Sequence, residues 1–196
     1  GTQWSQQAFF KASNTGQDDW FGSRLRLSGD GNTLAISAQL EDSDAKGING
    51  DQENDRAQEA GSVFVYTRTG TTWTQRAYVK AANNEAFDEF GSSMALSRDG
   101  RWLAVGARGE DSGRIFEWHP GGALREVPGS QMPGGNGIAV SPDGTTLYAS
   151  AWAGARIIVL SRRTGARREI GHAGTRVQLT TRRGERVRQP RVEDPA

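Results

Sequence analysis

Residues 41–59 concentrate side chains that could bind a metal ion. Seven carboxylates stand there against one lysine and one arginine. Carboxylates at this density repel one another unless water or a cation lies between them. Calcium takes six to eight oxygen ligands from a flexible loop, so the sequence predicts a calcium site in residues 41–55. The candidate ligands are Asp42, Asp44, Asn49, Asp51, Glu53 and Asp55.

The spacing of these ligands fits calcium only in part. Four of them alternate along the chain, namely Asn49, Asp51, Glu53 and Asp55. In an extended segment, alternating side chains share one face. The run from Asp42 resembles an EF-hand loop, but Lys46 stands at a ligand position and no flanking helix is evident. The alternative is a solvated, disordered acidic loop without metal.

Candidates for catalysis are sparse. The chain has no cysteine, which excludes disulfides and thiolate chemistry. It also lacks a Gly-x-Ser-x-Gly nucleophile motif and a phosphate-binding glycine loop. His119 and His172 are the only histidines, and no nucleophile is evident beside either. The sequence therefore favours binding or scaffolding, and leaves an enzymatic activity open.

The C-terminal part of the chain differs from the rest in charge. Residues 1–161 hold 14 Lys and Arg against 19 Asp and Glu, a balance of −5, whereas residues 162–191 hold ten Arg and two Glu, a balance of +8. These arginines have no interleaved aromatics, so we expect no nucleic-acid partner. Residues 171–196 are predicted to be an Arg-rich, disordered tail. No apolar run approaches the length of a membrane span.

The elements that must carry these residues are repeated along the chain. Three segments match others 69 positions later: 4–14 with 73–83, 21–23 with 90–92, and 27–31 with 96–100. A third copy of the Ser-x-Asp-Gly step lies at residues 141–144. The Asp-Gly pairs supply the positive φ of a tight hairpin, so Asp30, Asp99 and Asp143 are predicted to be turn residues.

Short strands with period-two patterning surround each Ser-x-Asp-Gly step. Four are predicted in each copy: 24–28, 33–38, 62–68 and 72–80; then 93–97, 102–107, 114–119 and 123–127; then 137–141, 146–151, 156–161 and 166–170. We therefore predict an all-β, partial β-propeller of about three four-stranded antiparallel blades. The blade repeats cover residues 21–80, 90–128 and 136–170 within a region from 1 to 170. Residues 4–13 are predicted to be the fourth strand of a blade whose other strands are missing, and therefore either to pair at an edge or to dangle.

The acidic segment is an insertion in the first copy. From the turn aspartate to the third strand takes 33 residues in copy one, 16 in copy two and 14 in copy three. About 17 residues, 42–59, are therefore added to the first blade. Long loops inside compact repeats are usually functional or disordered.

The first 112 residues resemble the FG-GAP repeats of integrin α-chain propellers and their bacterial relatives. Phe21-Gly22 and Phe90-Gly91 match the first half of the signature, and Gly106-Ala107 matches the second, with Arg108 where the family has proline. The resemblance implies a calcium-binding loop after the second half of the signature, where Asp42 and Asp44 lie.

Residues 113–165 resemble a different family, the gluconolactonase and arylesterase-like propellers. The similarity rests on residues 113–120 and 134–144. It implies a metal-ligand role for Asn136, although the other ligands of that family are not found here. The alternative function is thus a calcium-dependent hydrolase of the gluconolactonase type.

Together these patterns predict a non-enzymatic propeller module for protein interaction or surface scaffolding, assisted by calcium. We expect it outside the cytoplasm, in an extracellular, periplasmic or cell-surface location. Three blades are too few to close a ring, since propellers have about four to eight. The chain is therefore expected to be a fragment, to self-associate through its open blade edges, or to be marginally stable.

Overall fold

The computed structural model describes residues 3–108, 114–119, 125–128, 130, 135–151, 156–170 and 179–180. These residues form three antiparallel sheets, each a meander in which strand order follows chain order. Sheet 1 contains β1 (Phe21–Leu27), β2 (Thr33–Ala38), β3 (Ser62–Thr69) and β4 (Thr72–Val79). Sheet 2 contains β5 (Ser93–Leu96), β6 (Leu103–Gly106), β7 (Ile115–Trp118) and β8 (Arg125–Glu126). Sheet 3 contains β9 (Gly135–Val140), β10 (Thr146–Ala151), β11 (Arg156–Ser161), β12 (Arg167–Ile170) and β13 (Leu179–Thr180).

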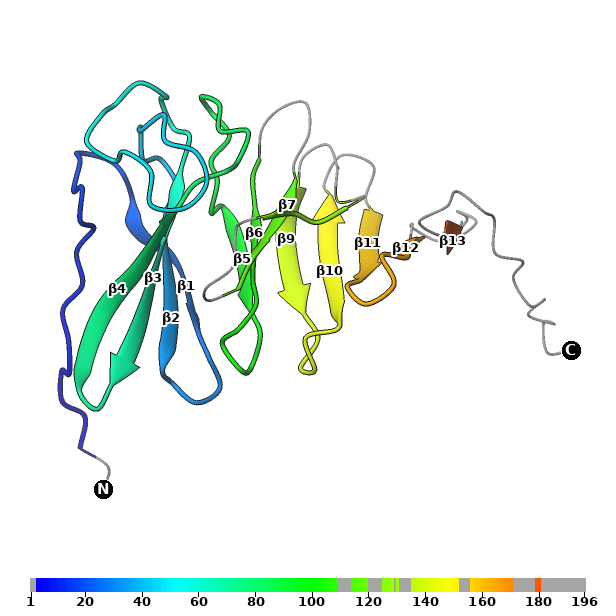
Figure 1. Cartoon of the computed structure of the whole chain (residues 1–196), viewed down its shortest axis with the longest axis horizontal. Helices are drawn as coiled ribbons and strands as arrows, with labels where there is room; N and C mark the ends of the chain where they lie inside the picture. The colour runs from blue at the N-terminus through cyan, green and yellow to red at the C-terminus, as the bar shows by residue number, and fades with distance from the viewer. Residues whose placement is uncertain are drawn as a thin grey trace, which may run out of the picture.

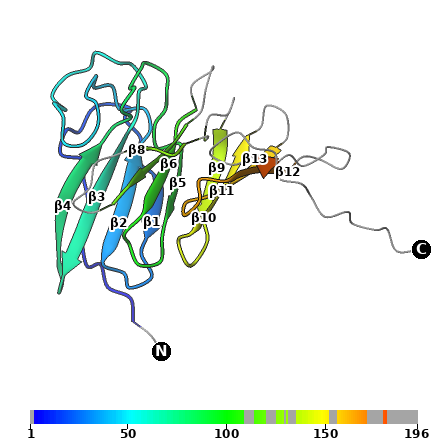
Figure 2. The same cartoon turned by 45° about the vertical axis from the view of Figure 1, so that its right-hand side comes forward.

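The three sheets stand in a row, with sheet 1 at the N-terminal end and sheet 3 at the C-terminal end (Figure 1). A turned view shows the sheets stacked face to face (Figure 2). The described residues include no helix, and therefore none that could span a membrane. The predicted all-β class is confirmed, because strands are the only regular elements among the described residues.

Apolar side chains fill the two spaces between the sheets. The first core joins sheets 1 and 2 through Ala35, Val63, Val65, Val79, Met94, Leu103, Val105 and Phe116. The second joins sheets 2 and 3 through Ala104, Ile115, Leu147, Ala149, Ile158 and Leu160. Each buried aliphatic side chain contributes about 1.5–3 kcal/mol relative to an exposed one. Stacking of sheet on sheet is thus the main source of stability.

The connectors that lead into sheets 1 and 2 repeat each other in backbone detail. Residues 69 positions apart share positive φ values: Asp18 and Phe87, Trp20 and Glu89, Gly22 and Gly91. At Gly91 the φ is +95°, and a Cβ there would lie 2.9 Å from Ser37 Cβ. This position therefore needs glycine both for conformation and for the close approach of the two sheets.

The Ser-x-Asp-Gly steps form the predicted hairpin turns. In the middle copy, Ser97 Oγ donates to Asp99 Oδ1 at 2.6 Å, and the Trp102 N–H donates to Ser97 Oγ at 2.9 Å. Ser28 with Asp30 and Ser141 with Asp143 make the same hydrogen bonds. The serine hydroxyl, followed by the backbone N–H two residues on, lowers the pKa of each aspartate.

The prediction of a strand for residues 4–13 is wrong. Residues 3–12 have no strand pairing and cross the outer face of sheet 1 by side-chain packing instead. Phe10 contacts the rings of Tyr66 and Trp73, with centroids 5.0 and 5.5 Å away, and the Tyr66 hydroxyl donates to the Lys11 carbonyl at 3.2 Å. No neighbouring strand is present to accept their backbone hydrogen bonds.

The structure describes only two residues of the tail that was predicted to be disordered. Leu179 and Thr180 form β13, which pairs with Arg168 and Arg167 of β12. The pairing uses backbone groups, which explains why the polar composition of this segment did not indicate it. The rest of residues 171–196 lies outside the described residues.

We expect Asp99→Asn to change the pH dependence of stability. Because the folded pKa of Asp99 lies below its unfolded value of about 3.9, its stabilising effect is complete above that value and is lost as pH falls through the folded pKa. The parent should exceed the variant in free energy of unfolding at pH 7, and the difference should vanish near pH 2. Urea unfolding at several pH values measures this, and a difference that is constant with pH would contradict it.

Candidate functional site

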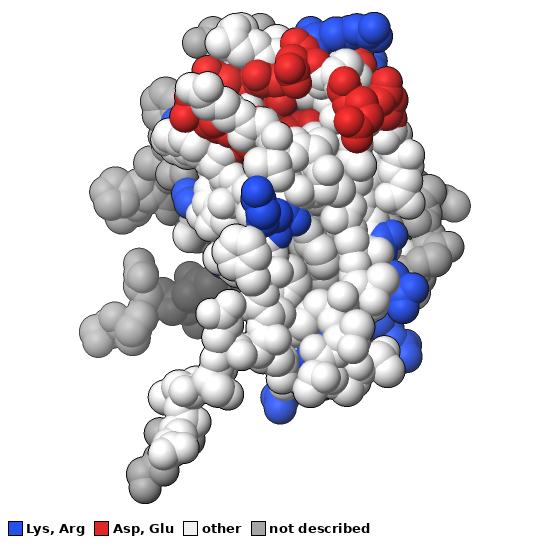
Figure 3. Space-filling model, turned by 90° about the vertical axis from the view of Figure 1, so that its left-hand side faces the viewer, with Lys and Arg blue, Asp and Glu red and all other residues white. Residues whose placement is uncertain are grey.

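The acidic segment forms a loop at one end of sheet 1, between β2 and β3. In the view of the outer face of sheet 1, acidic side chains gather at that end (Figure 3). Four of the loop carboxylates are exposed: Asp44, Asp51, Glu53 and Asp55. Exposure alternates from residue 49 to residue 55, as the spacing predicted, although this stretch is not a strand.

A buried ion pair fixes the base of this loop to β4. Lys80 Nζ lies 2.7 Å from Glu41 Oε2, and the two side chains are 0% and 2% exposed. The Tyr78 hydroxyl and the Asn14 amide each donate to Glu41 Oε1 at 2.7 Å. Burial lowers the pKa of Lys80, while Glu41 opposes that shift by favouring the ammonium. Burial also raises the pKa of Tyr78, so its hydroxyl stays a donor.

Backbone pairing holds the middle of the loop as well. Ile48 forms an antiparallel bridge with Val79 at the end of β4. Asn49 has a φ of +55° and pairs twice with Tyr78, donating its N–H to the carbonyl at 2.7 Å and accepting the Tyr78 N–H on Oδ1 at 2.9 Å. The loop is thus an ordered extension of sheet 1, which excludes the disordered-loop alternative for these residues.

The predicted calcium ligands of the loop have specific contacts. Asp42 Oδ1 accepts the Glu59 N–H at 2.7 Å, and Asp51 Oδ1 accepts the Glu53 N–H at 3.0 Å. Asp44 Oδ2 lies 3.8 Å from Arg56 Nη1. No three carboxylate or histidine side chains converge on one point within the described ranges. The structure thus spreads these ligands along the loop.

Asp19 joins this acidic region from the connector that precedes β1. It is buried, and its carboxylate accepts the Gly16 N–H at 2.7 Å. Burial raises the pKa of Asp19, and the nearby charges of Glu41, Asp42 and Asp55 add to the rise. Asp19 lies more than 20 positions before the loop in the sequence, so it was not among the predicted ligands.

Glu41 and Lys80 were not nominated for a specific role either, yet a sequence signal existed. Glu41-Asp42-Ser43 recurs 69 positions later as Glu110-Asp111-Ser112, and Lys80 follows Lys11 at the same offset. Because the lysine and the glutamate both recur at the same offset of 69 residues, they are consistent with a structural ion pair. Only the fold, however, shows that β2 and β4 bring these two together.

Asn136, the alternative metal ligand, and His119 lie away from this site. Asn136 lies on β9, in sheet 3, and its side chain lies outside the described residues. His119 follows β7 and packs edge-on against Trp102, with ring centroids 5.0 Å apart. Neither residue lies on the loop or on sheet 1.

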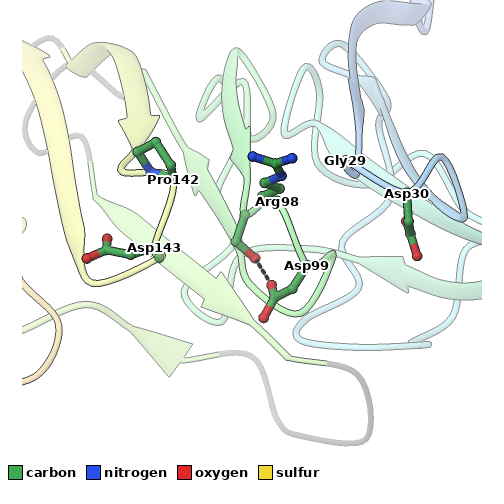
Figure 4. Close-up of a pocket in the computed structure, with 8 residues that line it drawn as sticks. Gly29, Asp30, Arg98, Asp99, Pro142 and Asp143 are labelled. Carbon is green, nitrogen blue, oxygen red and sulfur yellow. Dashed lines mark hydrogen bonds between the residues drawn. The ribbon is translucent and has the colours of Figure 1, made fainter.

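A groove of 570 Å³ runs across the three hairpin turns (Figure 4). Its lining residues are Gly29, Asp30, Ser97, Arg98, Asp99, Pro142, Asp143 and Gly144. The carboxylate of each aspartate is engaged by its own turn, and the Gly29 N–H donates to the Arg98 carbonyl at 2.8 Å. The groove therefore marks the junction of successive turns.

We expect Lys80→Met to destabilise the protein by about 3–5 kcal/mol, because it leaves the buried Glu41 carboxylate without a counter-charge. The double variant Lys80→Met with Glu41→Leu removes both charges and should be more stable than the single one. Urea unfolding of the parent and the two variants measures the free energies. A double variant less stable than the single one would show that the pair itself is not the important contact.

Comparisons with known proteins agree with this architecture. No curated protein matches the sequence. A "putative 6-phosphogluconolactonase" from Bacteroides fragilis is similar in structure, with a TM-score of 0.50, 19% identity, and coverage of 76% of this chain and 38% of that one. A second one, from Bacteroides uniformis, has a TM-score of 0.48, 20% identity, and coverage of 80% and 42%. The β-propeller domain of Cps50 (Swd1) from Myceliophteria thermophila has a TM-score of 0.48, 16% identity, and coverage of 70% and 39%.

These likenesses concern the fold, and the chain spans about two fifths of the length of the propellers it matches. The partial-propeller fold predicted from the repeats is confirmed. Residues 73–116 match the FG-GAP repeat family, from β4 of sheet 1 to β7 of sheet 2. This stretch of an all-β, partial propeller is similar to the FG-GAP repeats of that family.

Proposed function

We propose that this protein is a non-enzymatic propeller module that binds a protein partner through the acidic loop of its first blade. The observation that carries this is the burial of the Glu41–Lys80 pair beneath the loop. An inserted loop held by a buried pair and by a bridge to Val79 presents its outer side chains in a defined arrangement. Pre-organised loops lose less conformational entropy when they bind.

The exposed side chains of the loop define the chemistry of this partner. Residues 41–59 carry a net charge of −5. A surface of one sign attracts a partner of the opposite sign and speeds its association. The partner is therefore a protein segment rich in lysine or arginine.

We further propose that calcium binds the loop and Asp19 together. Asp42 and Asp51 each use Oδ1 in a backbone hydrogen bond, which leaves Oδ2 available as a ligand. Two buried amide oxygens beside the loop, Asn14 Oδ1 and Asn84 Oδ1, have no hydrogen-bond partner among the described residues. Oxygen atoms of these kinds are what calcium prefers. Calcium would also offset the repulsion that raises the pKa of Asp19.

Calcium binding by this loop would favour a location outside the cytoplasm. Extracellular calcium modules bind with dissociation constants of about 10⁻⁴–10⁻³ M, which suits a site of scattered oxygen ligands. Such a site is filled only where calcium is plentiful. We therefore propose an extracellular, periplasmic or cell-surface location.

Calcium should raise the melting temperature. Binding to the folded state alone stabilises it by about 2.7 kcal/mol when calcium exceeds its dissociation constant a hundredfold. Thermal melts with calcium and with a chelator test this, together with titration calorimetry. Asp42→Asn with Asp51→Asn should abolish the shift, because asparagine keeps the Oδ1 acceptor but removes the charge. Glu85→Gln, at an exposed site outside the loop, should leave it intact.

An unchanged melting temperature in the parent, with no heat of binding, would remove calcium from the proposed function. It would leave the protein-binding role untouched, since that role needs only the acidic surface. The two parts of the proposal are therefore tested separately.

The acidic surface can be tested with a fluorescent decalysine peptide as a stand-in for a cationic partner. Fluorescence anisotropy should show binding to the parent at low salt. The variant with Asp44→Asn, Asp51→Asn, Glu53→Gln and Asp55→Asn should lose at least tenfold in affinity. Asp18→Asn with Glu85→Gln, which neutralises exposed carboxylates elsewhere, should bind like the parent. Equal binding by all three proteins would show that the loop is not the contact surface.

A further inference from the structure

The two ends of the row of sheets leave apolar side chains exposed. On the outer face of sheet 1, Leu25 and Leu27 of β1 are 52% and 57% exposed. On the outer face of sheet 3, Tyr148, Ile157 and Ile170 are 43%, 45% and 39% exposed. The two faces lie at opposite ends of the row (Figure 1). Exposed apolar residues that cluster on one face commonly mark an interaction surface.

The internal repeat shows what the face of sheet 1 is built to contact. Leu25 and Leu27 correspond to Met94 and Leu96, which lie 69 positions later on β5. Met94 is fully buried and Leu96 partly buried, and both pack in the core between sheets 1 and 2. Leu25 and Leu27 of β1 are thus equivalent to residues that pack against a neighbouring sheet, but no sheet packs against them in this chain.

Sheet 3 carries the complementary half. When sheets 1 and 3 are aligned on their Ser-x-Asp-Gly steps and on their strand pairing, the residues of the free face of sheet 3 correspond to residues of sheet 1 that face sheet 2. Tyr148 of β10 matches Ala35, and Ile157 and Val159 of β11 match Val63 and Val65. In sheet 1 these three are 0–1% exposed because sheet 2 covers them.

We propose that a second copy of this chain covers these faces, with sheet 3 of each copy stacked on sheet 1 of the other. The contact would repeat the packing already present between sheets 1 and 2. Because it joins two different surfaces, it is head-to-tail, and two such contacts close a pair of chains. The closed pair holds six blades, within the range of about four to eight that forms a propeller ring.

The N-terminal segment leaves room for this contact. Phe10 contacts Tyr66 and Trp73, on β3 and β4, and the cluster that contains Phe10 and Ala12 extends to the buried side chains of β2. The exposed Leu25 and Leu27 lie at the other edge of the sheet, on β1. The free face of sheet 3 is carried by β10 and β11, which would cover that open half.

The charges at the two ends also complement each other. Sheet 1 carries the acidic loop, where residues 41–59 have a balance of −5. Residues 162–170, which follow β11 and include β12 of sheet 3, hold four Arg and one Glu, a balance of +3. Head-to-tail contact brings the acidic end of one copy to the basic end of the next. Pairing of like ends would instead place charges of the same sign together.

Sedimentation and native mass spectrometry of the full chain test this association. The parent should have twice the mass of the 21.2-kDa chain. Leu25→Glu and Ile157→Glu should each give monomers, since a charge on either face blocks both contacts of the ring. Phe87→Asn, which changes an exposed aromatic residue of the connector on neither face, should stay dimeric. A monomeric parent, or dimers that survive both face variants, would overturn the proposal.

Mixing the two monomeric variants separates head-to-tail from like-to-like contact. The Leu25→Glu protein keeps sheet 3 intact, and the Ile157→Glu protein keeps sheet 1 intact, so a mixture should recover a dimer held by one contact. Association through two copies of one face would leave one of the two variants dimeric on its own and form no mixed dimer, which would contradict the proposal. Tyr148→Lys can replace Ile157→Glu if circular dichroism shows that the latter is unfolded. About 1 M salt should weaken the recovered dimer, because it screens the charges of the two ends.

Discussion

The stacking of one sheet on the next is the interaction on which this structure depends. Each sheet has apolar side chains on both faces, and no sheet can bury both faces without neighbours. Within the chain, sheet 2 is covered on both sides. Sheet 1 covers part of its outer face with residues 3–12 and with the acidic loop, whereas sheet 3 leaves Tyr148 and Ile157 exposed. The same constraint thus explains both the stability of the middle and the open ends.

The buried Glu41–Lys80 pair solves a different problem, which is how to hold a long, highly charged loop on this scaffold. Its two charges lose their hydration, and only their close contact and the added donors of Tyr78 and Asn14 offset that cost. The benefit is therefore positional. Because the pair ties the loop to β4, the exposed carboxylates keep one arrangement, and a partner or a calcium ion meets a surface already formed.

The internal repeat made much of the fold predictable. Three of the twelve predicted strands, 33–38, 146–151 and 156–161, have the same bounds as β2, β10 and β11, and the other nine differ from the observed strands by at most three residues at either end. Strands and turns depend on local pattern, and Ser-x-Asp-Gly encodes its own hydrogen bonds. The predictions differed from the structure where a neighbouring strand decides whether a segment forms a strand. Residues 3–12 carry the sequence of a strand but find no neighbour, and Leu179 with Thr180 form β13 because β12 offers an unpaired edge.

For the candidate site, the sequence by itself determined which residues carry charge, where the insertion lies, and that its acidic positions alternate in exposure. Those properties are local, since they follow from composition and from the direction of successive side chains. Only the tertiary structure decided that Glu41 meets Lys80, that Asp19 joins the loop, and that Asp42 accepts the Glu59 N–H. These contacts join residues that are distant in sequence, so they exist only once β2, β3 and β4 pair and the chain ends pack on the sheet.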